Sequence, residues 1–464
     1  MRKFLLLLLL PIMAQAQSDS TQRWMCNMQV TYVTQYAMNN PKQIGYNTAY
    51  STGNTFIDNK SKSSLSSTLF LGTRLWKGAE LYVNPEVAGG QGIGGTLGIA
   101  GYPNGEIFRV GDPTPTLYVA RAFLRQTIKL NTIPVNSKGD DREYVKADQT
   151  QLSGFTSSKR LVFTVGKFTL ADIFDNNHYS HDSRTRLLNW SLMSAGAYDF
   201  ASDTKGYTYA AVGEYISPEF SIRFGTAMEP MYANGPMGPH KFMDLEAQTG
   251  NGIAYNYEIE KPFNLNKHKP SIFRALFFFN KNHSGEYALA QHGGSFDSIY
   301  FNNATKGMNQ VRSKTPSAVK YGIVLGLQQP ISEHAGMFSR ISWNDGHTES
   351  WAFAEIDNSI TAGFVFHCKA WHRFNDRLTI GLASNGISKD HQTYLAAGGY
   401  GFMLGDGKLN YGREGIIEVQ YEWEIKRGFI LSPDYQLISN PGYNKANGTI
   451  SVFGIRSHIE LYEY

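Results

Sequence analysis

The stretch from Ile417 to Ile425 alternates strictly between apolar and polar side chains over nine residues. One face carries isoleucine, valine, tyrosine and tryptophan, whereas the other carries three glutamates and a glutamine. Successive side chains of a β-strand point to opposite faces, so a period of two indicates a strand. The stretch is therefore predicted to be a strand with one apolar face and one wetted face.

The same alternation recurs along the chain. It is clear in 220–225, 253–260 and 453–461, and weaker at 28–36, 65–76, 79–86, 117–129, 160–168, 207–215, 271–280, 319–329, 336–344, 359–368, 377–385, 395–404 and 428–438. Together with 417–425 these make seventeen candidates, within one of the even counts 16 and 18. Most have nine to twelve residues, which suits a tilted membrane crossing. The predicted fold class is all-β, an antiparallel up-and-down transmembrane barrel.

The connections between these segments are of two kinds. Residues 214–220, 328–334 and 424–429 read as short turns, whereas 87–116, 169–206, 281–318 and 439–450 are long, polar and glycine-rich. Short turns at one end and long loops at the other are typical of outer-membrane barrels, with the long loops extracellular. There is no linker or fixed-period repeat, so residues 17–464 are predicted to form a single domain.

The start of the chain indicates export. Arg2 and Lys3 precede an apolar run from Phe4 to Met13, and Ala14-Gln15-Ala16 is a small-x-small cleavage site. This is the pattern of a secretory signal peptide, so residues 1–16 are predicted to be removed. No later segment approaches eighteen consecutive apolar residues. The exported chain is then either a soluble protein or a β-barrel in the outer membrane.

Composition narrows the choice further. Aromatic residues make up 13% of the chain and charged residues only 18%, which excludes a disordered protein. Two cysteines exclude a disulfide scaffold, and a formal charge of +4 without a basic block gives no sign of nucleic-acid binding. Mean hydropathy is −0.33, with Glu and Arg on the wetted faces. A barrel with a polar bore accommodates this better than a soluble sandwich or propeller, which needs a large apolar core.

Several long segments resemble the carbohydrate-selective porin family of Gram-negative outer membranes. They are residues 85–127, 166–210 and 340–364, together with YLAAGGYGFMLGDGKLNYG at 394–412 and SPDYQLISNPGYN at 432–444. The resemblance implies a single barrel of 16 strands through which small sugars, and some ions, diffuse passively. It implies that the protein uses no cofactor. The partners it implies are small carbohydrates, outer-membrane lipid and lipopolysaccharide, and it leaves open whether the barrel forms a homo-oligomer. One departure is that Tyr464 is out of phase with the lipid-facing row, which ends at Leu461.

A sugar pore needs a constriction with polar groups and aromatic faces. Arg121, Phe123 and Arg125 share one strand face, and we interpret it as lumenal because charges that face lipid are costly. Arginine suits sugar hydroxyls, because its fork of donors never loses its charge. Glu86 lies on a neighbouring lumenal face together with Glu80. The alternative is that these arginines only balance acidic residues of the wall.

The 169–206 loop is the best candidate for a segment that folds into the pore, because long loops in compact proteins are usually functional. Trp190 and Tyr198 are predicted either to stack on sugar or to anchor the loop to the wall. Arg109 and Asp112, in an earlier loop, are assigned to the same constriction. The remaining candidates of the 169–206 loop are Asp172, Asp175, His181, Arg184 and Arg186.

A metal site and two other classes of protein are considered as alternatives. His178 and His181 are weak evidence for a metal, because a site needs a third ligand with defined geometry, so no metal is predicted. No Gly-x-Ser-x-Gly motif occurs and no catalytic residues are assigned, which disfavours an outer-membrane barrel enzyme. An exported soluble sugar-binding β-protein would share the aromatic residues without opening a pore.

Overall fold

The computed structural model describes residues 21–38, 60–107, 114–130, 142–230, 252–265, 270–292, 318–399, 401–405 and 409–462. The predicted signal peptide lies outside the described residues, as do Arg109, Asp112 and Tyr464.

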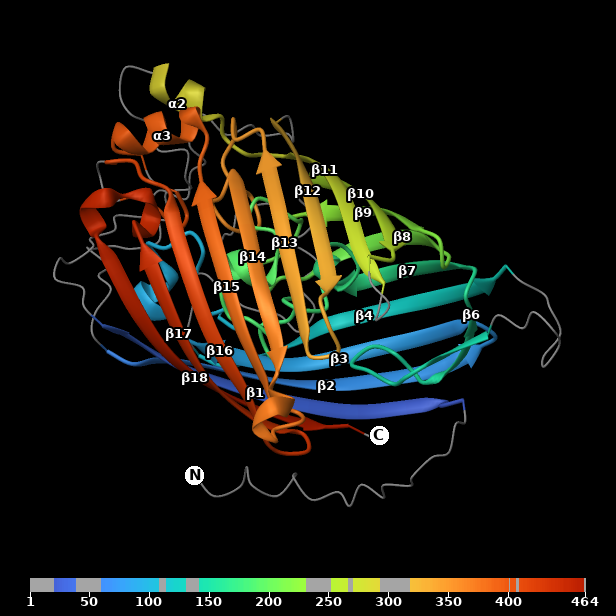
Figure 1. Ribbon diagram of the computed structural model, residues 1–464. Helices are drawn as coiled ribbons and strands as arrows, with labels where there is room; N and C mark the ends of the chain where they lie inside the picture. Colours follow the sequence, from blue (N-terminus) through green and yellow to red (C-terminus); the bar gives the residue numbers. More distant parts are fainter. Residues whose placement is uncertain are drawn as a thin grey trace.

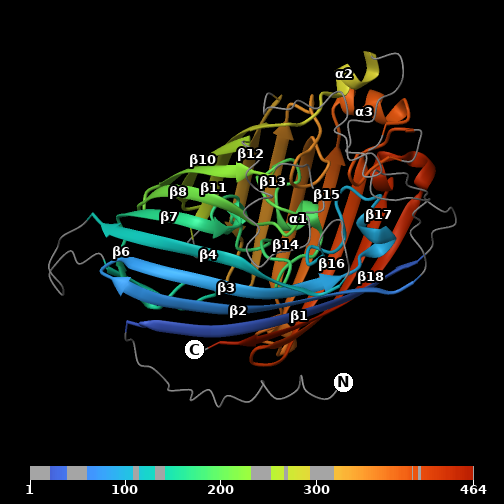
Figure 2. The same cartoon turned by 180° about the vertical axis from the view of Figure 1, so that it is seen from behind.

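Within these described ranges, sixteen antiparallel strands close into one barrel (Figure 1, Figure 2). The first and last strands complete the closure, with a register that runs from Met28 opposite Leu461 to Met38 opposite Ser451. The predicted fold class is thereby confirmed, with sixteen strands. They are β1 (Trp24–Met38), β2 (Lys62–Trp76), β3 (Ala79–Gly90), β4 (Thr116–Lys129), β7 (Arg160–Phe168), β8 (Thr208–Ile216), β9 (Ser221–Glu229), β10 (Gly252–Phe263), β11 (Ser271–Asn282), β12 (Ala318–Pro330), β13 (Ala335–Asn344), β14 (Asn358–His367), β15 (Arg377–Gly386), β16 (Glu414–Lys426), β17 (Phe429–Ser439) and β18 (Thr449–Leu461).

The distribution of polarity in the strands is the reverse of that in a soluble protein. In β16 the side chains of Ile417 and Trp423 are each 42% exposed, whereas Glu418 and Gln420 are fully buried. Arg340 and Arg456, from other strands, are among the largest fully buried side chains. Apolar groups outside and charges inside are stable only where the surroundings are apolar and the interior is polar. This pattern favours the membrane barrel over the soluble alternative.

One predicted strand is wrong. Residues 395–404 contain the end of helix α3 (Lys389–Ala396) followed by irregular chain. Ser388 starts that helix, because its side chain accepts a hydrogen bond from the N–H of His391. Beyond the helix, Met403 and Leu404 are buried, and their N–H groups donate to the carboxylate of Glu355. The apolar residues that suggested a strand therefore belong to a buried loop. The backbone N–H groups of this loop are satisfied by the carboxylate of Glu355 and not by a neighbouring strand.

Two tight turns at one end of the barrel rest on glycine. β2 and β3 are joined by Lys77 and Gly78, and β16 and β17 by Arg427 and Gly428. Both glycines have a positive φ, of 78° and 75°. A Cβ on Gly78 would lie 2.1 Å from the carbonyl oxygen of Thr127, so no other residue fits there without rearrangement. Because short turns mark the periplasmic end of such barrels, this end is assigned as periplasmic.

The connection from β4 to β7, residues 130–159, is an exception at this end. It carries the small hairpin of β5 (Arg142–Val145) and β6 (Gly154–Ser157), which pair only with each other among the described strands. No feature of the sequence pattern led us to expect this hairpin. Figure 1 shows β6 close to the ends of β2 and β3.

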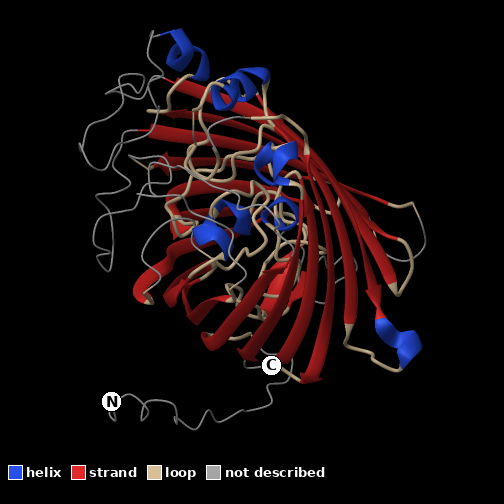
Figure 3. Cartoon of the chain, turned by 90° about the vertical axis from the view of Figure 1, so that its left-hand side faces the viewer, coloured by secondary structure: helices blue, strands red, loops and turns tan. Residues whose placement is uncertain are grey.

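Loops and short helices occupy the interior of the barrel (Figure 3). Buried apolar residues of these loops, such as Tyr102, Leu192 and Phe353, form one hydrophobic cluster with inward-facing residues of the strands. None of the described helices is both long and apolar enough to span a membrane. Besides α3, they are η1 (Ile93–Thr96), η2 (Leu170–Asp172), α1 (Trp190–Met193), α2 (Tyr287–His292), η4 (Cys368–Trp371), η5 (Pro441–Tyr443) and η6 (Lys445–Asn447).

Candidate pore constriction

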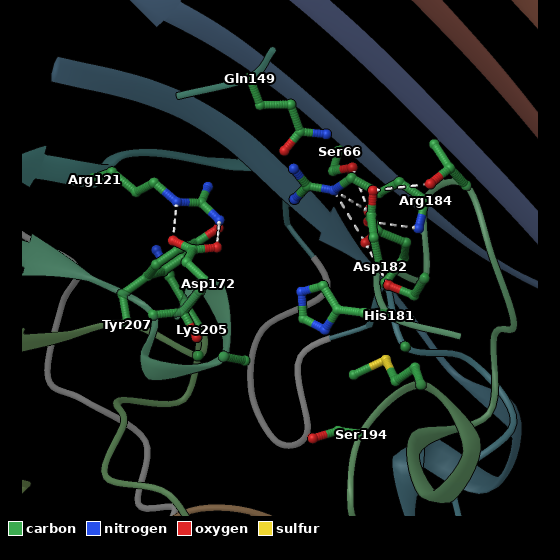
Figure 4. A pocket seen from close by; sticks show the side chains of 18 of the residues that line it. Ser66, Arg121, Gln149, Asp172, His181, Asp182, Arg184, Ser194, Lys205 and Tyr207 are labelled. Carbon is green, nitrogen blue, oxygen red and sulfur yellow. Dashed lines mark hydrogen bonds and ion pairs between the residues drawn. The ribbon is translucent and has the colours of Figure 1, made fainter. Parts of the chain in front are cut away.

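A cavity of about 670 Å³ lies inside the barrel, against the inner faces of β3 and β4 (Figure 4). Most of the rest of its wall comes from stretches that are distant in sequence: residues 105–107, residues 147–151 and the loop between β7 and β8. That loop folds into the barrel, as predicted for residues 169–206. The cavity is therefore where the inward loop and the strand wall face each other.

Arg184, from the inward loop, is the centre of one charged cluster. Its Nε lies 3.0 and 3.1 Å from the two carboxylate oxygens of Glu106, and its Nη2 lies 2.9 Å from Oε2 of Glu86. Its Nη1 donates to the hydroxyl of Thr68 at 3.1 Å. Burial opposes the charge, but the two carboxylates raise the pKa of Arg184 well above its ordinary value. The guanidinium thus stays charged and is held rigidly against β2 and β3.

Arg121 and Asp172 form a second pair across the cavity. The guanidinium of Arg121 on β4 makes two parallel hydrogen bonds of 2.6 Å to the carboxylate of Asp172 on η2. The ring of Tyr207 lies 5.3 Å from the guanidinium carbon of Arg121, close enough for a cation–π contact. Arg121 and Tyr207 both line the cavity, as Figure 4 shows. This wall thus combines a bidentate ion pair with an aromatic face.

Two further predicted arginines line the cavity. Arg125 donates from Nη1 to the carbonyl oxygen of Thr150 at 2.8 Å and lies over the ring of Tyr82. Nη1 of Arg186 lies 3.5 Å from Oε2 of Glu422. Burial, together with the nearby charge of Arg377, lowers the pKa of Arg186 to about 10. Arg186 therefore still carries its charge at neutral pH.

His181 also lines the cavity, and burial lowers the pKa of its imidazole. The ring is therefore neutral at pH 7 and offers one donor and one acceptor. Within the described part of the chain, no group of three His, Cys, Asp or Glu side chains is arranged to hold a metal ion.

Comparison with known proteins decides the family. A sequence profile of the carbohydrate-selective porin, OprB family, matches residues 64–461. The chain belongs to that family. Its structure is similar to that of OprB from Pseudomonas putida at high pH, with a TM-score of 0.66 and 14% sequence identity over 96% of this chain and 100% of that one. It also matches the outer membrane channel DcaP of Acinetobacter baumannii, with a TM-score of 0.49 and 9% identity over 97% and 100% of the two chains.

A search of curated protein sequences finds no match. The profile match therefore shows the family, and the likeness to OprB of Pseudomonas putida shows the fold. The protein is a sugar porin of the outer membrane, and family and fold indicate a channel rather than an enzyme.

Three residues predicted for the pore of this porin lie away from the cavity. Phe123 is buried and stacks on Tyr82, with ring centroids 5.1 Å apart. Asp175 is bonded to Arg340 at 2.7 Å. Tyr198 is buried and donates to Oδ1 of Asn256 at 2.7 Å. Each side chain fastens one part of the porin to another. For Tyr198 this contact matches the predicted alternative of anchoring the loop to the wall.

Trp190 is predicted either to stack on sugar or to anchor the loop, and its contacts favour the anchoring role. It borders the cavity, but it is almost fully buried and its indole N–H donates to the carbonyl oxygen of Asn104 at 3.1 Å. Its ring stacks on Phe353 with centroids 5.7 Å apart. The anchoring role predicted for it is therefore present in the structure, and little of the ring remains for a ligand.

The sequence analysis missed several residues that hold the inward loop. Arg340 donates to the side chain of Ser180 at 2.8 Å and to the carbonyl oxygen of Leu192 at 3.1 Å. Glu418 accepts the N–H groups of Leu188 and Asn189, at 2.6 and 3.0 Å. Both charged residues lie on the polar faces of alternating strands, and this pattern was the signal that could have identified them. Other missed residues that line the cavity are Glu106, Gln149, Lys205 and Tyr207.

Proposed function

We propose that this porin conducts small, uncharged carbohydrates by passive diffusion through the constriction between Arg121 and Arg184. The observation that carries the proposal is that both arginines line the cavity while paired with carboxylates, Arg121 with Asp172 and Arg184 with Glu86 and Glu106. Paired charges offer many donors and acceptors but only a small net field. Such a wall replaces the hydration of sugar hydroxyls without strongly attracting ions of one sign.

The size and the aromatic lining of the cavity support the same proposal. Its volume of about 670 Å³ lies within the range of about 300–1,000 Å³ that is usual for small-molecule pockets. Tyr207 adds an aromatic ring to the lining beside the charges, and the buried Tyr118 packs behind it with ring centroids 6.2 Å apart. An aromatic face suits the C–H face of a pyranose, whereas the paired charges suit its hydroxyl groups.

Passive diffusion fits the way the inward loop is held. Buried side chains of β13 and β16 bind the loop through ion pairs and backbone hydrogen bonds, so the constriction is preformed. We further propose that residues 1–16 are removed on export, which sequencing of the mature N-terminus tests. We also propose that sugars emerge chemically unchanged, because no catalytic group is assigned.

The decisive test is permeation of reconstituted liposomes. We expect swelling in monosaccharides, slower swelling in larger oligosaccharides, and unaltered sugar recovered from the vesicle interior. Liposomes that stay impermeable to monosaccharides would contradict the proposal, and converted sugar would indicate an enzyme. The fold of each preparation is checked by heat-modifiable gel mobility.

The role of Arg121 is tested by Arg121→Ala. Arg125 is left intact because it also holds the backbone of Thr150. Loss of one hydrogen-bonding partner for the sugar costs about 1 kcal/mol, so we expect the ratio of sugar to ion permeability to fall by about fivefold, with more cation current because Asp172 loses its partner. Arg274→Ala is the matched control: Arg274 pairs with Glu260 on an inner face that does not border the described cavity. Equal ratios in the two variants would remove Arg121 from the sugar path.

A further inference from the structure

The turn Asp148–Gln151 enters the porin from the periplasmic end. It belongs to the long connection between β4 and β7, and two backbone hydrogen bonds close it: Asp148 N–H to Gln151 O at 2.9 Å and Gln151 N–H to Asp148 O at 3.4 Å. Residues 147–151 line the same cavity as the inward loop. The cavity therefore has a wall that no extracellular loop supplies.

The turn is fastened to the barrel on several sides. The N–H of Leu152, which is fully buried, donates to the hydroxyl of Tyr82 at 3.1 Å. Arg74 on β2 donates to the carbonyl oxygen of Ser153 at 3.0 Å. Arg125 on β4 binds the carbonyl oxygen of Thr150. These contacts with β2, β3 and β4 make the turn a fixed part of the constriction.

Beside the carboxylate of Asp148, the turn presents neutral hydrogen-bonding groups to the cavity. Figure 4 shows Gln149 across the cavity from His181, with the Arg121–Asp172 pair on one side and Arg184 on the other. Its Nε2 lies 3.2 Å from Oε1 of Gln29 on β1, which occupies one amide N–H. The amide also bonds to the hydroxyl of Tyr462, which lines the same cavity, and its carbonyl oxygen is a further acceptor. Gln149 thus combines a donor and an acceptor in one uncharged group, as a sugar hydroxyl does.

We propose that Gln149 binds the hydroxyl groups of a passing sugar, so that the turn Asp148–Gln151 and the inward loop form a constriction with two polar sides. The inference rests on the proposed function, because it names a specificity-determining residue of the same pore. The arginine pairs supply strong donors that carry charge, whereas Gln149 supplies a neutral group on the periplasmic side. The contribution of Gln149 then favours sugars over ions, since its amide gives an ion no charge partner.

The experiment is sugar titration of the single-channel ion current, which measures the apparent Kd of sugar within the pore. Gln149→Leu replaces the amide by an apolar group of similar size and so separates hydrogen bonding from pore width, whereas Gln149→Ala removes both. We expect the apparent Kd to rise about threefold to tenfold in each, the effect of losing one neutral hydrogen bond. Without sugar, the ion conductance should stay near wild type in Gln149→Leu and increase in Gln149→Ala.

Gln126→Ala is the control. Gln126 lies near the periplasmic end of β4, where the connection that carries the turn begins, but it bonds to Trp76 on the outer face of the barrel. If wild-type protein shows no sugar-dependent reduction of current and no sugar permeation, the proposed function fails. If wild type binds sugar but Gln149→Leu and Gln149→Ala keep the Kd of the control, only the role of Gln149 is overturned. If Gln149→Ala alone changes the Kd, the side chain acts through pore width, which also overturns the hydrogen-bonding role.

Discussion

At the scale of single residues, carboxylates inside this porin hold loop backbone. Glu355 is fully buried, and its Oε2 accepts the N–H groups of Met403 and Leu404, both at 2.9 Å. Burial raises the pKa of Glu355 to about 7, although His391 and the two N–H groups act in the opposite direction. Near neutral pH this carboxyl is therefore close to half protonated, and the segment it holds depends on its charge.

The raised pKa of Glu355 predicts pH-dependent stability of residues 401–404. Since the folded pKa lies above the ordinary value of 4.5, the stabilisation is fully present below that value and is lost as pH rises through about 7. We expect the hydrogen-exchange protection of Met403 and Leu404, corrected for intrinsic rates, to fall between about pH 5 and pH 8. Glu355→Gln, which cannot ionise, should show no such fall. An equal fall in the variant would assign the effect to another group.

At the scale of elements, the inward loop and the strand wall stabilise each other. Arg340 on β13 binds Asp175, Ser180 and the backbone of Leu192. On β18, Arg456 donates to the carbonyl oxygen of Ser183 at 2.7 Å. Buried charges are costly unless they are paired and hydrogen-bonded, and here the loop supplies the partners of the wall. The loop is thereby held from β13 and from β18.

Arg340→Met tests whether this fastening sets the constriction. Removing one partner of a buried ion pair typically costs about 3–5 kcal/mol, and here the cost falls on the loop because Asp175 is left unpaired. We expect noisier and larger single-channel currents with weaker sugar preference, while the barrel keeps its heat-modifiable mobility. Arg274→Met, with its ion pair to Glu260 away from the loop, is the control. Currents like those of the control would show that Arg340 is dispensable for the constriction.

At the scale of the whole molecule, the barrel is apolar outside and polar inside, and its lipid-facing surface sets where charge is tolerated. The outward-facing side chains of β16 include Val419 near the middle of the strand and Ile425 next to its end. Trp423, also outward and exposed, fits the aromatic girdle of the membrane interface. The cost of a charge on this surface should therefore depend on its depth in the bilayer.

Val419→Arg and Ile425→Arg form a matched pair for this prediction. An arginine near the bilayer midplane costs about 2–4 kcal/mol, whereas near the interface it costs about 0–1 kcal/mol. We expect the free energy of unfolding in lipid vesicles, measured with a denaturant, to fall by these amounts. Equal losses in the two variants would contradict the placement of β16 across the membrane.

The alternating pattern was enough to place all sixteen barrel strands, because the direction of side chains in a strand depends only on local geometry. It also identified the lumenal faces that carry Glu86, Arg121 and Arg125. It did not distinguish residues on the same face by depth: Phe123 lies between Arg121 and Arg125 in β4 but packs on Tyr82 instead of lining the cavity. The pattern also failed at 395–404, where a buried carboxylate supplies the hydrogen bonds that a neighbouring strand would otherwise have made.

The sequence by itself thus determined the barrel, its two faces and the loop that enters it. Only the tertiary structure decided which charges meet. Arg184 reaches Glu106 and Glu86, which lie 78 and 98 positions away in the chain, and Gln149 bonds to Gln29 on β1. The physical reason is that each buried polar group must find a partner somewhere in the enclosed bore. Which strands and loops face each other inside the closed barrel determines the partners within reach, and no local pattern encodes this arrangement.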